Sequence, residues 1–320
     1  MSEQQFKKVF IFLDTDKHAS PFDMLTVVDI FPDAAVFKYE NVIVEDVEKI
    51  VFDVMFPRGP EGAKHTKIFI NGHDFKLANE ILEKIKQCMF QPFEIAVIID
   101  PRGAYTTATA AVAKTLEMLF VKGFGSLENK TVTVLAGTGP VGQTATRLYA
   151  SEKANVIVTS RSLQKASAIT TKVNEELQSE RVRGVETQTP EEIGKVIEKS
   201  EVILAAGAAG TQLLPLEVLK KYGKNCKVVA DINAIPPLGV EGLNSNDNGK
   251  ELLPYVFGIG ALTIGKFKNK VEVELVKKAA EDPKGVFDYK MAYEIAKKAI
   301  LVKREEKKPS ETEPPKYWLP

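Results

Sequence analysis

The sequence contains few of the residues on which disulfide and metal chemistry depend. Only two cysteines, Cys88 and Cys226, and three histidines occur among its 320 residues. The cysteines lie far apart in the chain, which argues against a disulfide framework and against thiolate metal sites. His18, His65 and His73 show none of the spacings typical of metal ligands. We therefore expect a protein of a reducing compartment that holds no metal.

Net charge and long apolar runs are also missing. Lys plus Arg and Asp plus Glu both number 43, so the formal charge is zero. Overall electrostatics therefore favour neither a nucleic acid nor an anionic membrane surface as partner. The first apolar run is about five residues long and is broken by Asp14, which is too short for a signal-peptide core or a membrane span. We expect a cytoplasmic protein.

Short apolar segments alternate with longer amphipathic ones along most of the chain, a pattern that predicts parallel strands joined by helices and hence an α/β protein. Strand candidates in the first third are KVFIFLD, AAVFKY, KIFING and FEIAVIID, with helices beginning near Phe22, Val44 and Asp74. A long helix from about Thr106 to Lys122 and the connector GFGSLENK should follow. The strands TVTVLAG, NVIVTS, EVILAA and KVVADI then predict a second sheet.

The length of 320 residues supports two domains with separate cores. We expect two open, mostly parallel sheet domains, one formed by residues 1–125 plus 270–320 and the other by residues 126–269. The stretch NAIPPLGVEGLNSNDNGKEL is too rich in turn residues for a long regular element. Helices are expected over roughly 270–281 and 288–302, the second packing back on the first domain. We expect the charged, proline-rich tail to be mobile, except where Tyr317 and Trp318 dock on a neighbour.

A glycine pattern lies at the end of the first strand of the second sheet. Gly137, Gly139 and Gly142 form GxGxxG between that strand and an expected helix. The first glycine permits a tight turn, the second lets the backbone approach a pyrophosphate, and the third lets helix and strand touch. A plain turn is the alternative, but the strand–helix–strand context favours a Rossmann-type dinucleotide site. The expected cofactor contacts in this loop are Gly137, Thr138, Gly139, Pro140, Val141 and Gly142.

The end of the next strand distinguishes the two nicotinamide cofactors. A carboxylate here would bind a free ribose 2′-hydroxyl, yet the sequence reads TSRSLQKA. Ser160, Arg161 and Lys165 are suited to a 2′-phosphate, so we favour NADP, with NAD as a weaker possibility. The alternative is that the two cations are solvated residues at a strand end.

Two later segments belong to the same predicted site. Ala206 and Gly207, in LAAGAAG, end a strand with small residues that suit either a close cofactor or tight helix packing. Asp231 and Asn233, in ADINAIPPLG, follow a strand at the end where ligands bind in open α/β sheets. Asp231 alternatively caps a turn.

Taken together, the motifs resemble those of the NAD(P)-dependent methylene-tetrahydromethanopterin dehydrogenases. The resemblance covers roughly residues 9–299 and rests on FLDTDKHASPFD, DPRGAYTTATAAVA, VLAGTGPVG with SRSLQKA, ADINAIPPLG and GIGALTIGKFK, in this order. It implies a two-domain enzyme with an interdomain cleft that oxidises the methylene carbon of a one-carbon-loaded pterin to the methenyl state. The carrier is tetrahydromethanopterin or tetrahydrofolate, and a homo-oligomer, either a trimer or a hexamer, is suggested.

This chemistry needs no general base, because loss of a hydride from a carbon between two nitrogens leaves an amidinium-like cation. The site must instead align the reactants, exclude water and place acidic or dipolar groups where positive charge develops. Asp14 and Asp16, in DTD, are the candidates for that role. One of them alternatively caps the helix near Pro21, although Ser20 is better placed as its cap.

Further substrate contacts are expected from Ser20, Arg102, Thr106 and Thr107, with the alternative that the threonines cap the long helix. Lys268 matches the lysine that family members carry after GIGALTIG, and we expect it in the cleft, holding a pterin carbonyl or ring nitrogen or pairing with an aspartate. The alternative is a solvated basic turn. The resemblance is to dehydrogenases without cyclohydrolase activity, and we expect none.

Two other functions are compatible with parts of the sequence. A shikimate dehydrogenase-like NADP oxidoreductase has a similar outline but leaves DTD and NAIPPLG unexplained. A non-catalytic NADP(H) sensor would keep the fold without turnover. The segment FPRGPEGAKH, residues 56–65, is expected to be a loop with glycine and proline hinges and is a candidate substrate lid.

Overall fold

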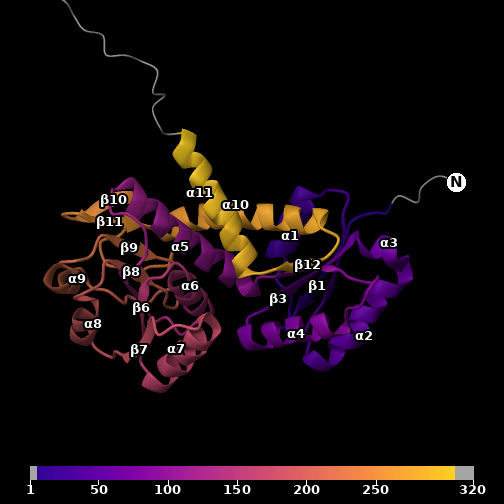
Figure 1. Cartoon of the computed structure of the whole chain (residues 1–320), viewed down its shortest axis with the longest axis horizontal. Coiled ribbons are helices and arrows are strands. Elements are labelled where there is room, and N and C mark those ends of the chain that lie inside the picture. Colours follow the sequence, from indigo (N-terminus) through magenta and orange to yellow (C-terminus); the bar gives the residue numbers. More distant parts are fainter. Residues whose placement is uncertain (1–5, 307–320) are drawn as a thin grey trace, which may run out of the picture.

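The computed structural model describes residues 6–306, with the backbone alone over 302–306. The predicted docking residues Tyr317 and Trp318 lie outside the described residues. Two lobes, each built on one sheet, are joined by long helices, and α11 (Tyr289–Glu306) extends from their junction (Figure 1). The α/β prediction with two mostly parallel sheets is thus confirmed. Among the described residues, no helix is long and apolar enough to cross a membrane.

The first sheet is parallel throughout, with the strand order β12-β4-β3-β1-β2. The four predicted strands are present, and the expected helices lie between them. A fifth, three-residue strand was not predicted, because it is too short to show an apolar pattern. The elements are β1 (Val9–Asp14), α1 (Phe22–Ile30), β2 (Ala35–Tyr39), α2 (Val44–Met55), β3 (Thr66–Asn71), α4 (Phe75–Cys88), β4 (Ala96–Ile99) and β12 (Gly285–Phe287).

The second sheet has the order β10-β11-β9-β8-β5-β6-β7, with only β10 antiparallel to its neighbour. Its parallel strands alternate with helices, as predicted. β5 lies between β8 and β6, so the chain order reverses there, and such a reversal is where open α/β sheets bind ligands. The elements are β5 (Thr131–Leu135), α6 (Pro140–Ser151), β6 (Asn155–Ser160), α7 (Leu163–Leu177), β7 (Val182–Glu186), α8 (Pro190–Ile197), β8 (Val202–Ala205), α9 (Leu216–Tyr222), β9 (Val228–Asp231), β10 (Asn248–Leu253) and β11 (Val256–Ile259).

Two stretches of the chain are more regular than predicted. The predicted loop after Ile232 ends in β10, which pairs with β11 as a short hairpin. The helix expected from residue 270 begins nine residues earlier, as α10 (Ala261–Glu281), so the predicted domain boundary at 269/270 falls inside it. Gly265 lies inside this helix, which tolerates an isolated glycine at modest cost when its other residues are anchored. Lys268 therefore projects from a helix and not from a basic turn.

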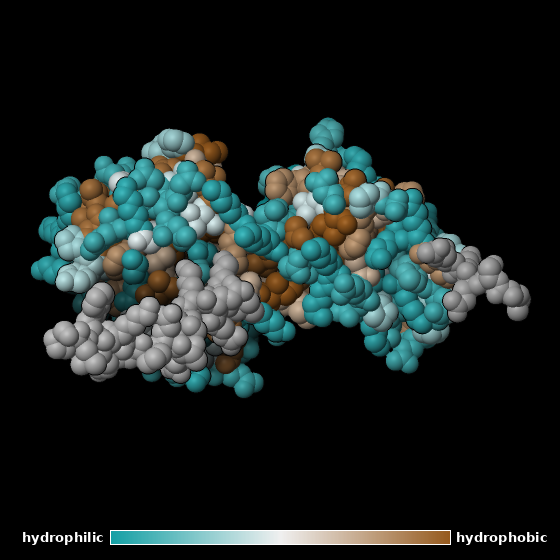
Figure 2. Space-filling model, turned by 90° about the horizontal axis from the view of Figure 1, so that it is seen from above, coloured by the Kyte–Doolittle hydropathy of each residue, from teal (hydrophilic) through white to brown (hydrophobic). Residues whose placement is uncertain are grey.

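The lobes share a hydrophobic core around α5 (Ala104–Val121), whose start and end lie close to the prediction. Small side chains, among them Ala108, Ala110 and Ala111, are buried along this helix. They let α6, α10 and α11 pack closely against it. The space-filling view shows two lobes with a hollow between them and apolar side chains near its floor (Figure 2). The long helices thus hold the ends of both sheets in fixed positions beside the junction.

Candidate active site

The loop between β5 and α6 has the geometry of an anion site. Gly139 is the N-cap of α6, and in the described chain no side chain makes a cap hydrogen bond there, so the first N–H groups of the helix stay available. A Cβ on Gly139 would meet nothing within 4 Å, whereas one on Gly142 would lie 2.5 Å from the Gly137 Cα. The second glycine therefore faces open space and the third permits close packing, as the motif predicts.

Beside this loop lies a pocket of about 660 Å³. Thr138, Ser160, Arg161, Lys165 and Gly207 line it, all of them predicted cofactor contacts. Its other polar lining residues, which sequence analysis did not identify, come from the ends of neighbouring strands: Thr159, Ser162, Thr187, Gln188, Thr189, Thr211 and Gln212. None of the described lining residues is acidic.

Asp231 and Asn233 lie at the carboxyl end of β9, but their side chains hold the loop that follows. Asp231 is buried and accepts hydrogen bonds from the N–H groups of Asn233 and Val240, at 2.9 and 3.1 Å. Asn233 accepts from the Ile235 N–H at 2.9 Å and donates to the Pro237 carbonyl at 2.9 Å. Burial raises the pKa of Asp231, against the lowering effect of these N–H groups. Ala206 is buried at the end of β8.

The carboxyl ends of β1, β3 and β4 bring the first lobe's polar motifs together. Asp14 on β1 is directly opposite Asn71 on β3. Asp14 is fully buried, and its oxygens accept from the N–H groups of Asp16 at 2.9 Å and Ser20 at 3.0 Å. Its carboxylate therefore shapes the turn from 14 to 20. Pro21, not Ser20, is the N-cap of α1, and it makes no side-chain cap bond.

Asp16, by contrast, reaches the surface and holds Arg102. The Arg102 guanidinium donates to Asp16 Oδ2 from Nε at 2.9 Å and also from Nη2, and the His73 ring lies 2.7 Å from the same oxygen. Burial acts to raise the pKa of Asp16, but hydrogen bonds from His73 and Arg102 outweigh it and lower the pKa. The ion pair fixes the guanidinium on a backbone that is left-handed, with φ 49°.

A pocket of about 280 Å³ lies beside Arg102, and it contains four of the predicted substrate or catalytic residues. Its lining residues are Ser20, Phe22, Asp23, Arg102, Gly103, Thr107 and Lys268. Thr106 does not line it, because its hydroxyl is buried and donates to Asp100. Gly103 matters for access, since a Cβ there would lie 3.2 Å from the Lys268 Cε.

Lys268 belongs to a buried network of charged groups that sequence analysis missed. Its Nζ donates to Glu272, one turn further along α10, and Asp23 and Asp100 are the other carboxyl groups nearby. Burial acts to lower the pKa of Lys268, but the carboxylates of Asp100, Glu272 and Asp23 outweigh it and raise the pKa. Burial raises the pKa of Asp100, which accepts from the N–H groups of Tyr105 and Thr106. The spacing Lys268–Glu272 was the only sequence signal of this cluster.

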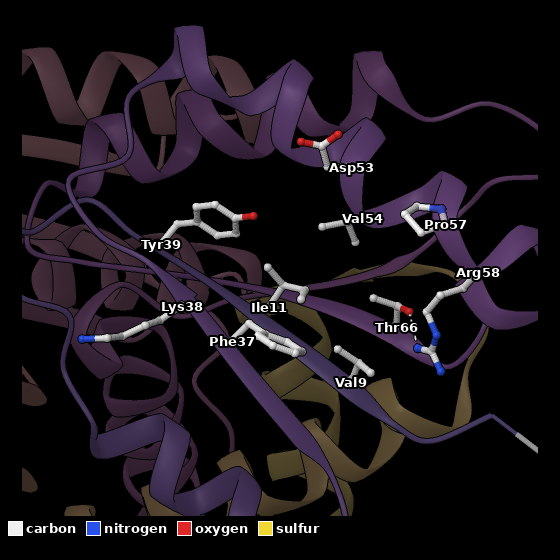
Figure 3. Close-up of a pocket in the computed structure, with 10 residues that line it drawn as sticks. All are labelled: Val9, Ile11, Phe37, Lys38, Tyr39, Asp53, Val54, Pro57, Arg58 and Thr66. Carbon is white, nitrogen blue, oxygen red and sulfur yellow. Dashed lines mark hydrogen bonds between the residues drawn. The ribbon is translucent and has the colours of Figure 1, made fainter.

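The predicted lid over residues 56–65 is wrong in its structure and its position. The segment is helical, with a 3₁₀ turn at Phe56–Arg58 followed by α3 (Gly59–Ala63). Arg58 donates to Thr66 Oγ1 at 2.7 Å and to the Lys7 carbonyl at 2.6 Å, which ties the segment to the sheet. Figure 3 shows Arg58 and Pro57 at a groove between α2 and the edge strand β2. No residue that lines this groove also lines the Lys268 pocket.

Family models match both halves of the chain. Residues 21–102 match the N-terminal domain of methylene-tetrahydromethanopterin dehydrogenase, and residues 119–243 match shikimate/quinate 5-dehydrogenase. The first match contains Phe22, Asp23 and Arg102 of the Lys268 pocket. The second covers most of the lobe that carries the glycine loop.

Two curated relatives from Methylorubrum extorquens are similar over nearly the whole chain. The bifunctional protein MdtA is 35% identical over 91% of this chain and 98% of its own length. An NAD(P)-dependent methylenetetrahydromethanopterin dehydrogenase is 31% identical over 88% of this chain and 94% of its own length. Among solved structures, quinate dehydrogenase from Corynebacterium glutamicum in complex with NAD has a TM-score of 0.51 at 13% identity, covering 91% of this chain and 99% of its own. That likeness shows the fold alone.

Proposed function

We propose a function from one premise, which is that this chain belongs to the family of NAD(P)-dependent methylene-tetrahydromethanopterin dehydrogenases. The reaction is reversible transfer of a hydride from the methylene carbon of methylene-tetrahydromethanopterin, or of methylene-tetrahydrofolate, to NADP. The product is the methenyl form of the one-carbon carrier. We further propose that the enzyme works in the cytoplasm as a homo-oligomer, a trimer or a hexamer.

The residues at the carboxyl edge of the second sheet fit a dinucleotide. The uncapped N-terminus of α6 and the open space at Gly139 suit a pyrophosphate. Arg161 and Lys165 at the end of β6 suit a 2′-phosphate, and none of the described residues that line their pocket supplies a carboxylate to bind a free ribose 2′-hydroxyl. These observations support NADP over NAD. When bound, the cofactor supplies the hydride acceptor.

In this proposal the role of Asp231 and Asn233 is indirect. Their side chains are engaged within the loop after β9 and would fix its backbone beside the cofactor. Ala206 and Gly207 would let the cofactor approach closely, because they are small residues. A Cβ on Gly207 would meet the Leu213 side chain at 2.8 Å, so a larger residue there would disturb the pocket wall.

Substrate binding is assigned to the pocket around Lys268. Its ammonium and the Arg102 guanidinium would donate hydrogen bonds to carbonyl or ring-nitrogen acceptors of the pterin, and Ser20 and Thr107 would add hydroxyl groups. Phe22 offers an apolar face for a flat ring, and the Lys268 Nζ lies 4.8 Å from its ring centroid. Asp14 would act by shaping the turn before α1, and Asp16 by orienting Arg102.

The pocket's charges suit a reaction that creates a cation without releasing a proton. Each of its cationic side chains has a carboxylate partner, Asp16 for Arg102 and Glu272 for Lys268. Because each cation is paired, its repulsion of the positive charge that develops on the substrate is weaker than that of an isolated cation. The buried Asp100 carboxylate adds an anion close to Lys268.

The observation that carries the proposal is the coincidence of two features in one chain: the pocket that unites Arg102, Thr107 and Lys268, and the acid-free pocket that carries Arg161 and Lys165. The test is absorbance-monitored turnover of purified protein with each methylene pterin, separately with NADP and with NAD. Turnover of one pterin with NADP preferred is expected. Binding of NADP without turnover of either pterin would favour the sensor function, and turnover of an alcohol such as shikimate would favour the alternative oxidoreductase.

A further inference from the structure

Two buried carboxyl groups at the substrate pocket each have one oxygen without a partner. Asp23 is 3% exposed and Glu272 is 1% exposed. Asp23 Oδ2 accepts from the Asn71 side-chain amide, and Glu272 Oε2 accepts from Lys268 Nζ. The remaining oxygens, Asp23 Oδ1 and Glu272 Oε1, are buried and have no hydrogen-bond partner among the described residues. These two orphans belong to neighbouring side chains, one on α1 and the other on α10.

Leaving both groups ionised would be costly. Burying an acceptor without a donor is unfavourable, and burying a second unpaired anion beside it is more so. The groups that face the pair are Lys268 on α10 and Asp100 after β4, with Arg102 at the pocket wall already held by Asp16. One ammonium would then face three carboxylates in a buried space. One proton held between the two carboxyl groups satisfies both orphaned oxygens and removes one of the negative charges.

We propose that Asp23 and Glu272 share one proton, and that this carboxyl pair is the positioning device that fixes Lys268 toward substrate. The role of Lys268 toward substrate rests on the proposed function, whereas the shared proton does not. In this arrangement Glu272 keeps one oxygen for Lys268, and the proton keeps the other oxygen from drawing the ammonium out of the pocket. Asp23 is a positioning residue, since it acts through Glu272.

Two further observations support the shared proton. Burial, and next the neighbouring carboxyl group of Glu272, raise the pKa of Asp23 to about 9. A metal ion is the other way to satisfy several carboxylates, but the described residues contain no group of His, Cys, Asp or Glu placed to hold one. The pair therefore keeps its proton at neutral pH and loses it in alkaline solution.

The substitution Asp23→Asn imitates the protonated state. An asparagine here can accept from Asn71 and donate an amide N–H to Glu272, so it replaces the shared proton with one that does not titrate. Asp23→Ala removes the donor and leaves Glu272 with an orphaned oxygen. The control is Asp29→Asn, the same change at an exposed position on the same helix. Folding of each variant is checked by its thermal unfolding curve.

The first readout is the pH profile of kcat/KM for hydride transfer. The wild type and Asp29→Asn are expected to lose activity as the pair deprotonates in alkaline solution, while Asp23→Asn lacks this alkaline fall. Asp23→Ala is expected to lose about tenfold to a hundredfold at neutral pH, the effect of one orphaned buried group. An alkaline fall that persists unchanged in Asp23→Asn would overturn the proposal.

The second readout needs no substrate. Infrared difference spectra of the free protein between neutral and alkaline pH report the carbonyl band of a protonated carboxyl group. The wild type and Asp29→Asn should lose such a band that Asp23→Asn does not show. The other buried carboxyl groups, Asp100 and Asp231, are present in every variant and therefore do not account for a difference between them. Identical spectra of the wild type and Asp23→Asn would refute the shared proton. Absence of pterin turnover would refute the proposed function and leave this test intact.

Discussion

Replacing Arg161 by alanine should separate the two nicotinamide cofactors. Arg161 is exposed at the end of β6 and lines the acid-free pocket with Lys165. A hydrogen bond from a charged donor contributes about 1.5–3 kcal/mol, and exposure to water places this one near the lower end. About 1.5 kcal/mol corresponds to roughly tenfold in affinity. The KM for NADP should therefore rise about tenfold in Arg161→Ala, while the KM for NAD, which has no 2′-phosphate, stays near the wild-type value.

The assay measures initial rates at saturating methylene pterin while NADP or NAD is varied. Lys172→Ala is the matched control, since Lys172 is an exposed cation on α7, the same helix as Lys165, but outside the pocket. Adding Lys165→Ala to Arg161→Ala should raise the KM for NADP further but by less than the sum of the single effects, because both groups would bind one phosphate. Equal increases in KM for NADP and NAD would refute the assignment, as would an effect of Lys172→Ala as large as that of Arg161→Ala.

Three further predictions concern the substrate lobe. Gly103→Ala should destabilise the protein by about 1–2 kcal/mol, because φ is +68° there. It should also lower kcat/KM, because the new Cβ would crowd Lys268. Gly123→Ala, at φ +77° in open space, is the control for backbone strain in both the denaturation and the rate assays. Burial raises the pKa of Asp23 from its ordinary value of 3.8 to about 9, so between these pH values the folded protein holds one proton more at this group than the unfolded chain. The contribution of Asp23 to the free energy of unfolding should therefore fall as pH rises from about 4 to about 9, by up to about 1.4 kcal/mol per pH unit. Urea denaturation across that range should show a flatter dependence in Asp23→Asn, and parallel curves would contradict this. Finally, the protein should not accelerate hydrolysis of the methenyl pterin, and disappearance of its absorbance faster than in buffer would contradict that expectation.

The fold was predictable from the sequence because its information is local. Apolar runs such as TVTVLAG and NVIVTS are long enough to identify strands, and GxGxxG identifies the loop where β5 meets α6. The errors arose where local composition misled. The expected helix was started at residue 270, nine residues too late, and the glycines and prolines of residues 56–65 suggested a loop where the chain is helical.

The candidate site was less predictable, because a polar residue at a strand end can serve either a ligand or the protein itself. Asp14 and Asp231 both lie at the carboxyl end of a strand, where ligands are expected to bind, yet the oxygens of each accept hydrogen bonds from backbone N–H groups of the segment that follows. Sequence position alone does not distinguish the two uses. Asp23 and Glu272 were missed for a different reason. They lie about 250 residues apart, and only packing of α1 against α10 brings them together.

The same network bears on why a lysine is present beside a carbon that becomes cationic. An isolated ammonium in a poorly solvated pocket would oppose loss of the hydride. Lys268 is compensated by Glu272 and Arg102 by Asp16, so their charges cancel at short range. If Asp23 is neutral through the shared proton, Asp100 leaves the buried group with one net negative charge. Neutralising that charge in Asp100→Asn should therefore slow methylene oxidation more than it weakens pterin binding, a split between kcat and KM that a purely structural role of Asp100 would not produce.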